Sequence, residues 1–374
     1  MAAGTQILAP VAGEHRVGRT YLWVRFVAAA PLVALVLLLP LHSDVYGHVS
    51  AYAAIFVMVG LSMNVLTGYT GQISLGHQAF VGLGALTAAN VVSTGVRPAD
   101  GFSFAIGMVC AAAASGAAAL LLGAVALRIR GLYLALVTLV FGSVFADAVF
   151  TLPSLNGQDA GVPAYRPSFM ATEYRFYLFA LAMALICAYV DVCVRRTKVG
   201  RGLVALRDNE LVASAFGVNV LGYKLLGFTI SGAMAGLAGG VFAFWEQAFS
   251  DKDFTAIAGF NLALTFVVVA VVGGLGNRGG VIAASVFFAL VSPLSPFLEW
   301  FARQTHWATY YGNNKFYISN VIGAVLLLQT VILNPGGLGQ VIRPFARWFG
   351  GHKFNLHDSD GGGVGTMEGS SVRA

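Results

Sequence analysis

Apolar segments long enough to cross a lipid bilayer recur along the whole chain. A helix needs about 20 predominantly apolar residues to cross roughly 30 Å of hydrocarbon. Such stretches lie near residues 22–41, 49–67, 77–95, 102–127, 132–150, 174–194, 222–245, 257–274, 280–301 and 316–334. Because an unpaired backbone N–H or C=O group costs several kcal/mol in lipid, each stretch is expected to be a helix. The expected fold class is therefore an all-α polytopic membrane protein with about ten transmembrane helices.

The composition agrees with a membrane protein and argues against nucleic-acid binding. Hydrophobic residues make up 57% of the chain and charged residues 10%, whereas soluble proteins contain about 25% charged residues. The net charge of +6 comes from Lys and Arg that lie mainly at the ends of apolar segments, not on one helix face. With the basic segment 195–221 in the cytoplasm, the positive-inside rule places both termini there as well.

Three regions are expected along the chain. They are a cytoplasmic N-terminal segment, a transmembrane domain and a cytoplasmic tail, at residues 1–21, 22–334 and 335–374. The tail is rich in Gly and Ser and is expected to be disordered. The first apolar stretch is expected to be retained, because it is longer than the core of a signal peptide and no small-x-small cleavage site follows Pro40. The three cysteines show no CxxC spacing, so neither a disulfide framework nor a metal site is expected.

A basic run and a short helix of mixed polarity follow the sixth apolar stretch. The basic residues are Arg195, Arg196, Lys198 and Arg201. Residues 202–216 then have the pattern of a single helix of about four turns, with Gly217 as its C-cap. Arg207, Glu210 and Ser214 share one stripe of this helix. The helix is too polar to span a membrane, which favours docking of a cytosolic partner; a helix lying at the lipid headgroups is the alternative.

Polar side chains and glycines interrupt the apolar pattern between residues 64 and 84. The polar residues are Asn64, Gln72, Ser74, His77 and Gln78. Irregular backbone at membrane depth is tolerated only inside protein or beside a water-filled cavity. Discontinuous helices in transporters use half-helix ends to hold the charged groups of a zwitterion. The pattern therefore predicts a broken helix that lines a translocation path, with a hinge or a close helix crossing as the alternative.

Four runs in this order resemble one transporter family. They are YTGQISLGHQAF at 69–80, GLYLALVTLVFG at 131–142, the segment 200–217, and VVGGLGNRGGVIAA at 271–284. Together they resemble the LivM-type permeases of branched-chain amino acid ABC transporters, from about residue 52 to residue 339. The resemblance implies a type II ABC importer permease-like fold. It also implies that residues 202–216 are a coupling helix that sits in a groove of an ATP-binding subunit.

The resemblance further implies the partners of this chain and its location. The partners are ATP-binding cassette subunits, a second LivH-type permease chain, an extracytoplasmic substrate-binding protein and membrane lipid, with no nucleic acid. The chain is expected in a bacterial plasma (inner) membrane. No GxxxxGKS/T phosphate loop occurs, and the Gly-rich run at 273–280 lacks its lysine, so this run is expected to be an interhelical turn. ATP is therefore expected to be bound by partner subunits, and this chain to be no enzyme and to hold no cofactor.

Two groups of candidate site residues follow. Gln72, Ser74 and His77 match the family's GQxSLGH signature, and they join Asn64 as candidates for the substrate path. His77 is interpreted as a proton-sensitive gate, a neutral hydrogen-bonding group or a packing residue. The candidates for coupling to the ATPase are Arg201, Arg207, Asp208, Glu210 and Gly217. The loop after residue 246 forms a candidate landing surface for the binding protein, together with Arg97, Arg166 and Arg303.

The predicted function is that of a transmembrane permease subunit of an ATP-driven ABC importer for branched-chain amino acids or related small polar solutes. The same family serves other amino acids, urea and short-chain amides, so the substrate stays open. The alternative is an ion-coupled secondary amino-acid transporter, which should place a carboxylate in mid-membrane, whereas Asp147 and Asp191 lie near predicted span ends. An intramembrane hydrolase built on Ser74 and His77 lacks a GxSxG motif and a matched oxyanion hole.

Overall fold

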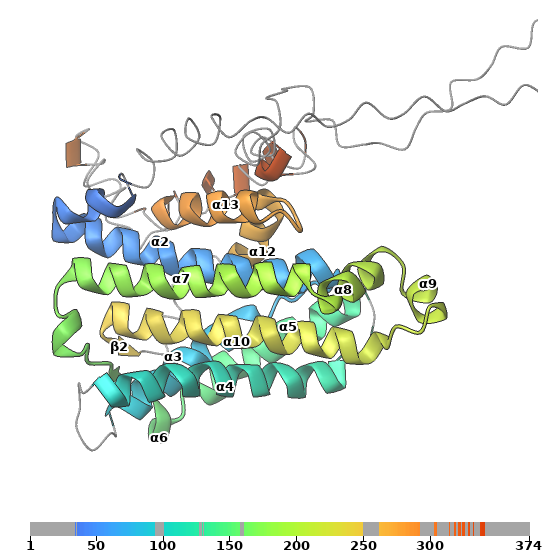
Figure 1. Cartoon of the computed structure of the whole chain (residues 1–374). Helices are drawn as coiled ribbons and strands as arrows, with labels where there is room; N and C mark the ends of the chain where they lie inside the picture. The colour runs from blue at the N-terminus through green and yellow to red at the C-terminus, as the bar shows by residue number, and fades with distance from the viewer. Residues whose placement is uncertain are drawn as a thin grey trace, which may run out of the picture.

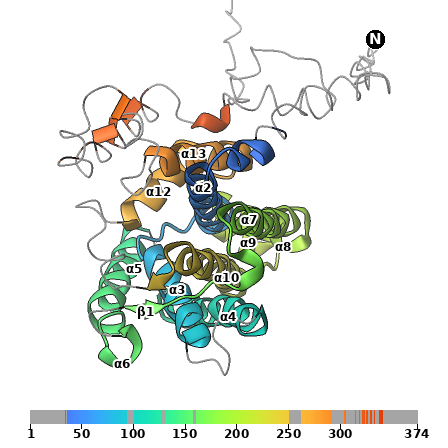
Figure 2. The same ribbon diagram turned by 90° about the vertical axis from the view of Figure 1, so that its left-hand side faces the viewer.

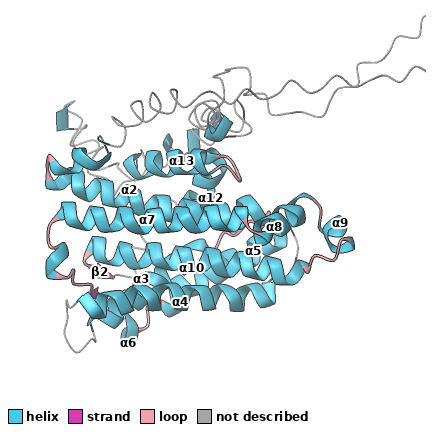
Figure 3. Ribbon diagram, in the orientation of Figure 1, coloured by secondary structure: helices cyan, strands magenta, loops and turns pink. Residues whose placement is uncertain are grey.

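The computed structural model describes residues 34, 36–93, 101–126, 129, 131–157, 161–249 and 262–291, with short pieces between residues 303 and 340. Helices make up nearly all of its regular structure (Figure 3). They are η1 (Leu39–Leu41), α2 (Asp44–Met63), η2 (Asn64–Tyr69), α3 (His77–Ser93), α4 (Gly101–Ala126), α5 (Leu132–Val144), η3 (Phe145–Val149), α6 (Pro153–Asn156), η5 (Ser168–Met170), α7 (Glu173–Arg196), α8 (Lys198–Asp208), α9 (Glu210–Ala215), α10 (Val220–Glu246), α12 (Leu262–Gly273) and α13 (Arg278–Val291). Strands β1 (Val162–Pro163) and β2 (Ala248–Phe249) form one short antiparallel pair, with Val162 opposite Phe249.

Four of the described helices are long and apolar enough to cross a membrane, and they lie where the hydropathy predicted spans. They cover Asp44–Tyr69, Gly101–Ala126, Glu173–Arg196 and Val220–Glu246. Shorter apolar helices cover Tyr133–Val149, Leu264–Gly273 and Arg278–Val291. The predicted spans near 22–41 and 316–334 lie largely outside the described residues, as does the predicted tail. The coarse fold prediction, a membrane protein made of helices, is confirmed.

Helix α10 lies in the middle of the bundle. It packs against α2 on one side and against α3 and α4 on the other, while α7 lies beside α2, and α13 covers the far side of α2 (Figures 1 and 2). Ser231 Oγ of α10 donates to the Ser62 carbonyl at 2.8 Å, and Trp245 Nε1 donates to the His48 carbonyl at 2.9 Å. These two contacts show that α2 and α10 are antiparallel. Helices α8 and α9 project from one end of the bundle (Figure 1).

Small residues let α10 approach α3 until the two backbones touch. A Cβ on Gly84 of α3 would lie 2.2 Å from the Gly236 carbonyl oxygen, and one on Gly239 would lie 1.8 Å from the Val81 carbonyl oxygen. Lipid tails are as apolar as leucine, so helices in a membrane associate through such close packing and through interhelical hydrogen bonds. The glycines of α10 therefore set the position of α3 in the bundle.

The irregular backbone predicted between residues 64 and 84 is confined to a shorter segment. Helix α2 continues directly into the π-helix η2, and the irregular segment covers residues 71–76. Gly71 has a φ of +70°, which glycine adopts without steric cost. Helix α3 then begins at His77 and runs alongside α10, antiparallel to α2. The prediction of a broken helix is therefore correct only in part, because the irregular segment joins two antiparallel helices.

The prediction of a single helix at 202–216 is wrong. The structure has two helices, α8 and α9, separated by Asn209. Asn209 is extended, with a φ of −161°, and its Oδ1 accepts hydrogen bonds from Leu211 N and Val212 N at 3.0 and 3.1 Å. An asparagine that caps the start of a new helix competes with continuation of the previous one. Gly217, with a φ of +80°, follows the last turn of α9, as the sequence predicts for its C-cap.

Gly239→Val is expected to destabilise the bundle, because no room exists between Gly239 and the Val81 carbonyl. Overpacking of this kind costs about 3 kcal/mol, which lowers the unfolding midpoint by roughly 5–10 °C. Thermal unfolding in detergent, followed by tryptophan fluorescence, measures the shift. Ala124→Val, at an exposed position of α4, is the matched control. An unchanged midpoint in Gly239→Val would contradict the close approach of α3 and α10.

Candidate functional site

A buried carboxylate organises the polar groups at the α8 end of the bundle. Asp191 of α7 is fully buried, and its Oδ2 lies 2.5 Å from Nε of Arg278, the first residue of α13. Asn64 Nδ2 donates to Asp191 Oδ1 at 3.1 Å, and the Tyr69 hydroxyl donates to Oδ2 at 3.0 Å. A buried charge is tolerated when an opposite charge and hydrogen bonds satisfy it. Asp191 therefore holds α7, η2 and α13 together.

The turn between α12 and α13 belongs to the same cluster. Gly276 N donates to Asn64 Oδ1 at 3.0 Å, and the Gly276 carbonyl accepts from Arg195 Nη1 at 2.6 Å. Gly274 and Gly276 both have positive φ, at 91° and 81°, which suits a tight turn. The Gly-rich run at 273–280 is thus an interhelical turn, as the sequence predicts, and both η2 and the end of α7 hold it in place.

The candidate coupling residues lie in two different settings. Arg207 Nη1 donates to the Gly68 carbonyl of η2 at 2.6 Å, and Glu210 forms an ion pair with Lys224 of α10. The charged groups of Arg207 and Glu210 therefore contact this chain itself. Arg207 is exposed despite its contact with Gly68, as are the remaining candidates, Arg201, Asp208 and Gly217.

The tip of the molecule, formed by α9 and the start of α10, exposes apolar side chains. Leu211, Val212 and Phe216 are 74%, 51% and 84% exposed, and Leu221 at the start of α10 is 50% exposed. These side chains come from consecutive turns of one projecting segment (Figure 1). Apolar side chains that cluster in this way on a polar surface mark an interaction site.

His77, the first residue of α3, is completely buried. Its Nε2 lies 2.7 Å from Ser62 Oγ, and the Ser62 hydroxyl donates to the Val59 carbonyl at 2.7 Å. Because the single Ser62 proton is used in this way, His77 Nε2 is the donor and Nδ1 is left as an acceptor. Nδ1 has no hydrogen-bond partner in the described part of the chain. The Phe80 ring packs edge-on against His77, so this residue combines packing with one unused acceptor.

Gln72 and Ser74 lie in the irregular segment. Gln72 is 8% exposed and Ser74 is fully buried, and no described residue forms a hydrogen bond with Ser74 Oγ. Leu75 N donates to Thr138 Oγ1 of α5 at 3.0 Å, which ties the segment to α5. Three of the four candidate path residues therefore lie in or next to the irregular segment. The fourth, Asn64, belongs to the cluster around the buried carboxylate.

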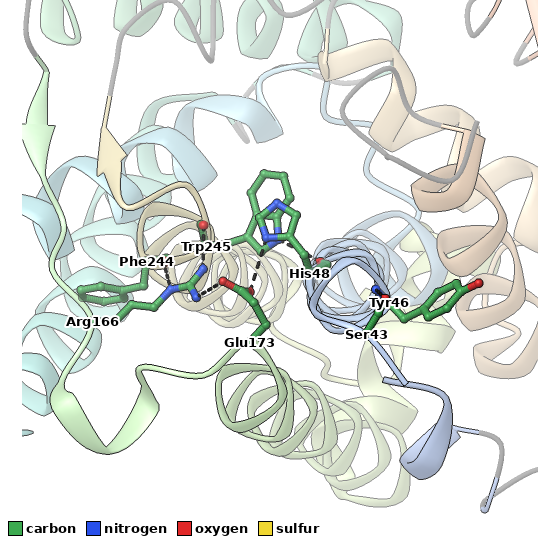
Figure 4. Close-up of polar contacts among 7 residues, drawn as sticks. All are labelled: Ser43, Tyr46, His48, Arg166, Glu173, Phe244 and Trp245. Carbon is green, nitrogen blue, oxygen red and sulfur yellow. Dashed lines mark hydrogen bonds and ion pairs between the residues drawn. The ribbon is translucent and has the colours of Figure 1, made fainter. Parts of the chain in front are cut away.

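A second polar cluster lies at the opposite end of the bundle, where α2, α7 and α10 meet (Figure 4). Arg166 Nη1 lies 2.6 Å from Glu173 Oε1, and its Nε and Nη2 donate to the Phe244 and Trp245 carbonyls at 2.7 and 2.9 Å. Arg166 thus satisfies carbonyls in the last turn of α10. His48 stacks on the Trp245 ring at 4.2 Å and lies 3.4 Å from Glu173 Oε2.

The position of Arg166 in this second cluster contradicts its predicted role in a landing surface for the binding protein. The Arg166 side chain is only 4% exposed, so it faces the bundle and not a partner. Arg97 lies outside the described residues, and Arg303 is exposed. Sequence reasoning missed both clusters, because their members come from distant segments. For Asp191 a signal was available, since an ionisable residue inside an apolar stretch marks a functional candidate.

An apolar helical bundle with polar clusters at both ends and an exposed tip defines a multi-pass membrane component. The chain belongs to the branched-chain amino acid transport system permease component family, whose sequence profile matches residues 46–330. It is 30% identical over 271 residues to the high-affinity branched-chain amino acid transport system permease protein LivM of Salmonella typhimurium, covering 65% of this chain and 61% of that protein. LivM of Escherichia coli K12 is 29% identical with the same coverage.

A more distant relative belongs to a different transport system. The guanosine ABC transporter permease protein NupQ of Bacillus subtilis is 26% identical over 269 residues, covering 65% of this chain and 79% of that protein. The match to this chain spans 61% of the length of the two LivM proteins. No solved structure matches the chain.

Asp191→Leu is expected to be destabilising, because it leaves Arg278 without its buried partner. Breaking one side of a buried ion pair costs about 3–5 kcal/mol, whereas replacing both partners by apolar residues is close to neutral. Arg278 is 29% exposed, so we expect a loss near the lower end. Asp191→Leu/Arg278→Leu should recover much of the stability lost in Asp191→Leu when the variants are unfolded chemically in detergent. Asp147→Leu, at an exposed position, is the control; additive losses in the double variant would contradict the coupling.

Proposed function

We propose that this chain is a transmembrane permease subunit of an ATP-driven ABC importer for branched-chain amino acids or related small polar solutes. The observation that carries the proposal is the family match over residues 46–330, supported by the LivM relatives. The relatives also include a guanosine permease and a galactose/methyl galactoside import permease. The proposal therefore extends to small polar solutes other than amino acids.

The proposed architecture is a type II ABC importer permease with about ten transmembrane helices. The proposed regions are a cytoplasmic segment, the permease domain and a cytoplasmic tail, at 1–21, 22–334 and 335–374. Basic residues gather at the end of α7 and on α8, which supports a cytoplasmic position for that end in a bacterial plasma (inner) membrane. We assign ATP binding to partner subunits, so this chain is not an enzyme and needs no cofactor.

We propose that the tip inserts into a groove of an ATP-binding subunit. Leu211, Val212 and Phe216 supply the apolar anchors, since a short helix docks by laying its apolar side chains into a groove. Arg201 and Asp208, exposed on α8, belong to the polar rim of this surface. The turn of the chain at Gly217, between α9 and α10, gives the tip its shape. Arg207 and Glu210, in contrast, hold the tip to its own chain.

We propose that the irregular segment faces the translocation path between this chain and a LivH-type permease. Ile73 is 50% exposed there, and irregular backbone next to lipid is not tolerated, so protein or water must cover it. The unpartnered Ser74 Oγ and His77 Nδ1 are then available to the solute once the helices around them move. Asn64 acts at the inner end of the path through its contact with Asp191.

The proposed cycle is alternating access. Closure of two ATP-binding subunits moves the tips of the paired permeases, which switch between outward-open and inward-open states. A substrate-binding protein delivers the solute at the end that carries Arg166 and Glu173. An ion-coupled secondary transporter would need a carboxylate free to bind an ion, whereas the fully buried Asp191 is paired with Arg278. That alternative is therefore disfavoured.

Purification of the tagged full chain from its native cells tests the assembly. Mass spectrometry should find ATP-binding subunits and a second permease in stoichiometric amounts. Phe216→Asp places a charge in the apolar anchor and should reduce recovery of the ATP-binding subunits by about tenfold or more. Phe102→Asp, at a position that is 76% exposed at the other end of the bundle, should not. Recovery of the unaltered chain alone would contradict the proposal.

Uptake of labelled leucine into liposomes that contain the purified complex tests the transport step. Uptake should require ATP and should stop with a non-hydrolysable analogue. Uptake driven by an imposed ion gradient without ATP would instead favour the secondary transporter. Guanosine and galactose serve as competitors that define the solute class.

Ser74→Ala separates a role in the path from a role in packing. Because Ser74 Oγ has no hydrogen-bond partner among the described residues, its removal should leave stability unchanged, while leucine uptake falls by about fivefold or more. Ser62→Ala is the comparison, since Ser62 bonds both His77 and the Val59 carbonyl and its loss should cost about 1 kcal/mol. Normal uptake in Ser74→Ala would remove this residue from the path.

A further inference from the structure

Arg207 bridges α8 and η2. Its Nη1 donates to the Gly68 carbonyl at 2.6 Å, within the last turn of η2. In the part of the chain that the structure describes, this is the one side-chain hydrogen bond between α8 and η2. The donor is charged, which makes such a bond stronger than one between neutral groups. The contact therefore ties α8 to the helix turn that precedes the irregular segment.

Glycines leave the room that the Arg207 side chain occupies. A Cβ on Gly71 would lie 3.1 Å from Arg207 Cγ, and one on Gly276 would lie 3.1 Å from Arg207 Nη1. Gly68 approaches the α12–α13 turn so closely that a Cβ there would lie 2.7 Å from Gly276 N. The side chain thus rests against η2, the start of the irregular segment and the turn at once. Lysine lacks the planar, multi-donor head group that suits this position.

Other contacts join α8 and α9 to α10. Glu210 forms its ion pair with Lys224. Gly202 of α8 lies against Tyr223, whose ring would be 2.5 Å from an added Cβ. A movement of the tip therefore reaches the central helix through these contacts and reaches η2 through Arg207.

We propose that Arg207 is a positioning residue that transmits movement of the tip to η2 and to the irregular segment, and that it does not dock the ATPase. This inference rests on the proposed function, because a partner must move the tip. Gly68 and Gly71 receive the movement at either side of the point where the helix ends. The irregular segment carries it to Ser74 and His77, each of which has a buried polar atom without a hydrogen-bond partner among the described residues. Arg207 thereby links nucleotide binding to the state of the path.

Labelling of Ile73→Cys in the purified complex tests the proposal without knowledge of the solute. Ile73 lies in the irregular segment and is 50% exposed. Mass spectrometry of the peptide that contains residue 73 measures its rate of reaction with a maleimide. We expect trapping with ATP and vanadate to change this rate by about fivefold or more. Adding Arg207→Gln should abolish the change while the ATP-binding subunits still co-purify. Arg196→Gln, at an exposed position at the end of α7, is the matched control and should preserve the change.

Three outcomes would overturn the proposal. The first is loss of the ATP-binding subunits from Arg207→Gln, which would make Arg207 a docking residue. The second is a normal nucleotide-dependent change in Arg207→Gln. The third is no change in the complex that keeps Arg207, which would mean that the irregular segment does not respond to nucleotide. Failure of the unaltered chain to bring down any ATP-binding subunit would contradict the proposed function instead, and the two failures are therefore distinguishable.

A covalent replacement of the contact keeps the test open if Arg207→Gln folds poorly. A Cβ on Gly71 would lie 3.5 Å from Arg207 Cβ, within the range of about 3.5–4.5 Å that suits a disulfide. Because Gly71 has a φ of +70°, a cysteine there is strained, so thermal unfolding of Gly71→Cys alone is measured beside that of the double variant. Oxidation joins the two new cysteines of Gly71→Cys/Arg207→Cys, so that they no longer react with the maleimide added afterwards. Nucleotide-dependent labelling at Ile73→Cys should then return, and reduction of the disulfide should remove it. Arg207→Cys alone should show no rescue by oxidant, which controls for the native cysteines. An oxidised double variant that behaves like the reduced one would overturn the proposal.

Discussion

The bundle depends on the close approach of α10 to its neighbours. In a membrane no hydrophobic force pulls one apolar helix to another, so contact between backbones at small residues must supply the attraction. Gly236 and Gly239 allow this contact with α3. With α10 fixed in the middle, its two ends reach the two polar regions of the molecule. Lys224 near one end pairs with Glu210 in the tip, and Trp245 near the other stacks on His48.

The two polar clusters connect some helices of the bundle to one another and leave other segments without such connections. Arg166 and Glu173 join α10 to the start of α7, and Asp191 joins the other end of α7 to η2 and α13. Helix α7, and α2 together with its extension η2, thus take part in both clusters, whereas α10 takes part in the one around Arg166. Helix α5 and the irregular segment are joined to each other through Thr138 but take no part in either cluster. In the proposed alternating-access cycle, relative motion therefore has a natural boundary between these two groups.

Most helix positions could be predicted from the sequence, because an apolar stretch of sufficient length is a local property that lipid converts directly into a helix. The site could be predicted only in part. The stripe that joins Arg207 to Glu210 exists only in a continuous helix, and Asn209 ends that helix between them. Arg207 therefore turns toward Gly68, and Glu210 toward Lys224. The hydrogen-bond and ion-pair partners of Asp191 could not be predicted, because no local sequence pattern connects α7 with η2 and α13.

The π-helical form of η2 amounts to one residue inserted into the end of α2. If this turn returned to α-helical hydrogen bonding, one residue would leave the helix, and everything beyond that point would rotate by about 100° and shift by about 1.5 Å. The Asn64 amide and the Gly68 carbonyl, which now bond to Asp191 and Arg207, cannot both keep their partners through such a step. In the proposed coupling, α8 would therefore act on an element that can change by a discrete step of register and not on a continuously elastic one.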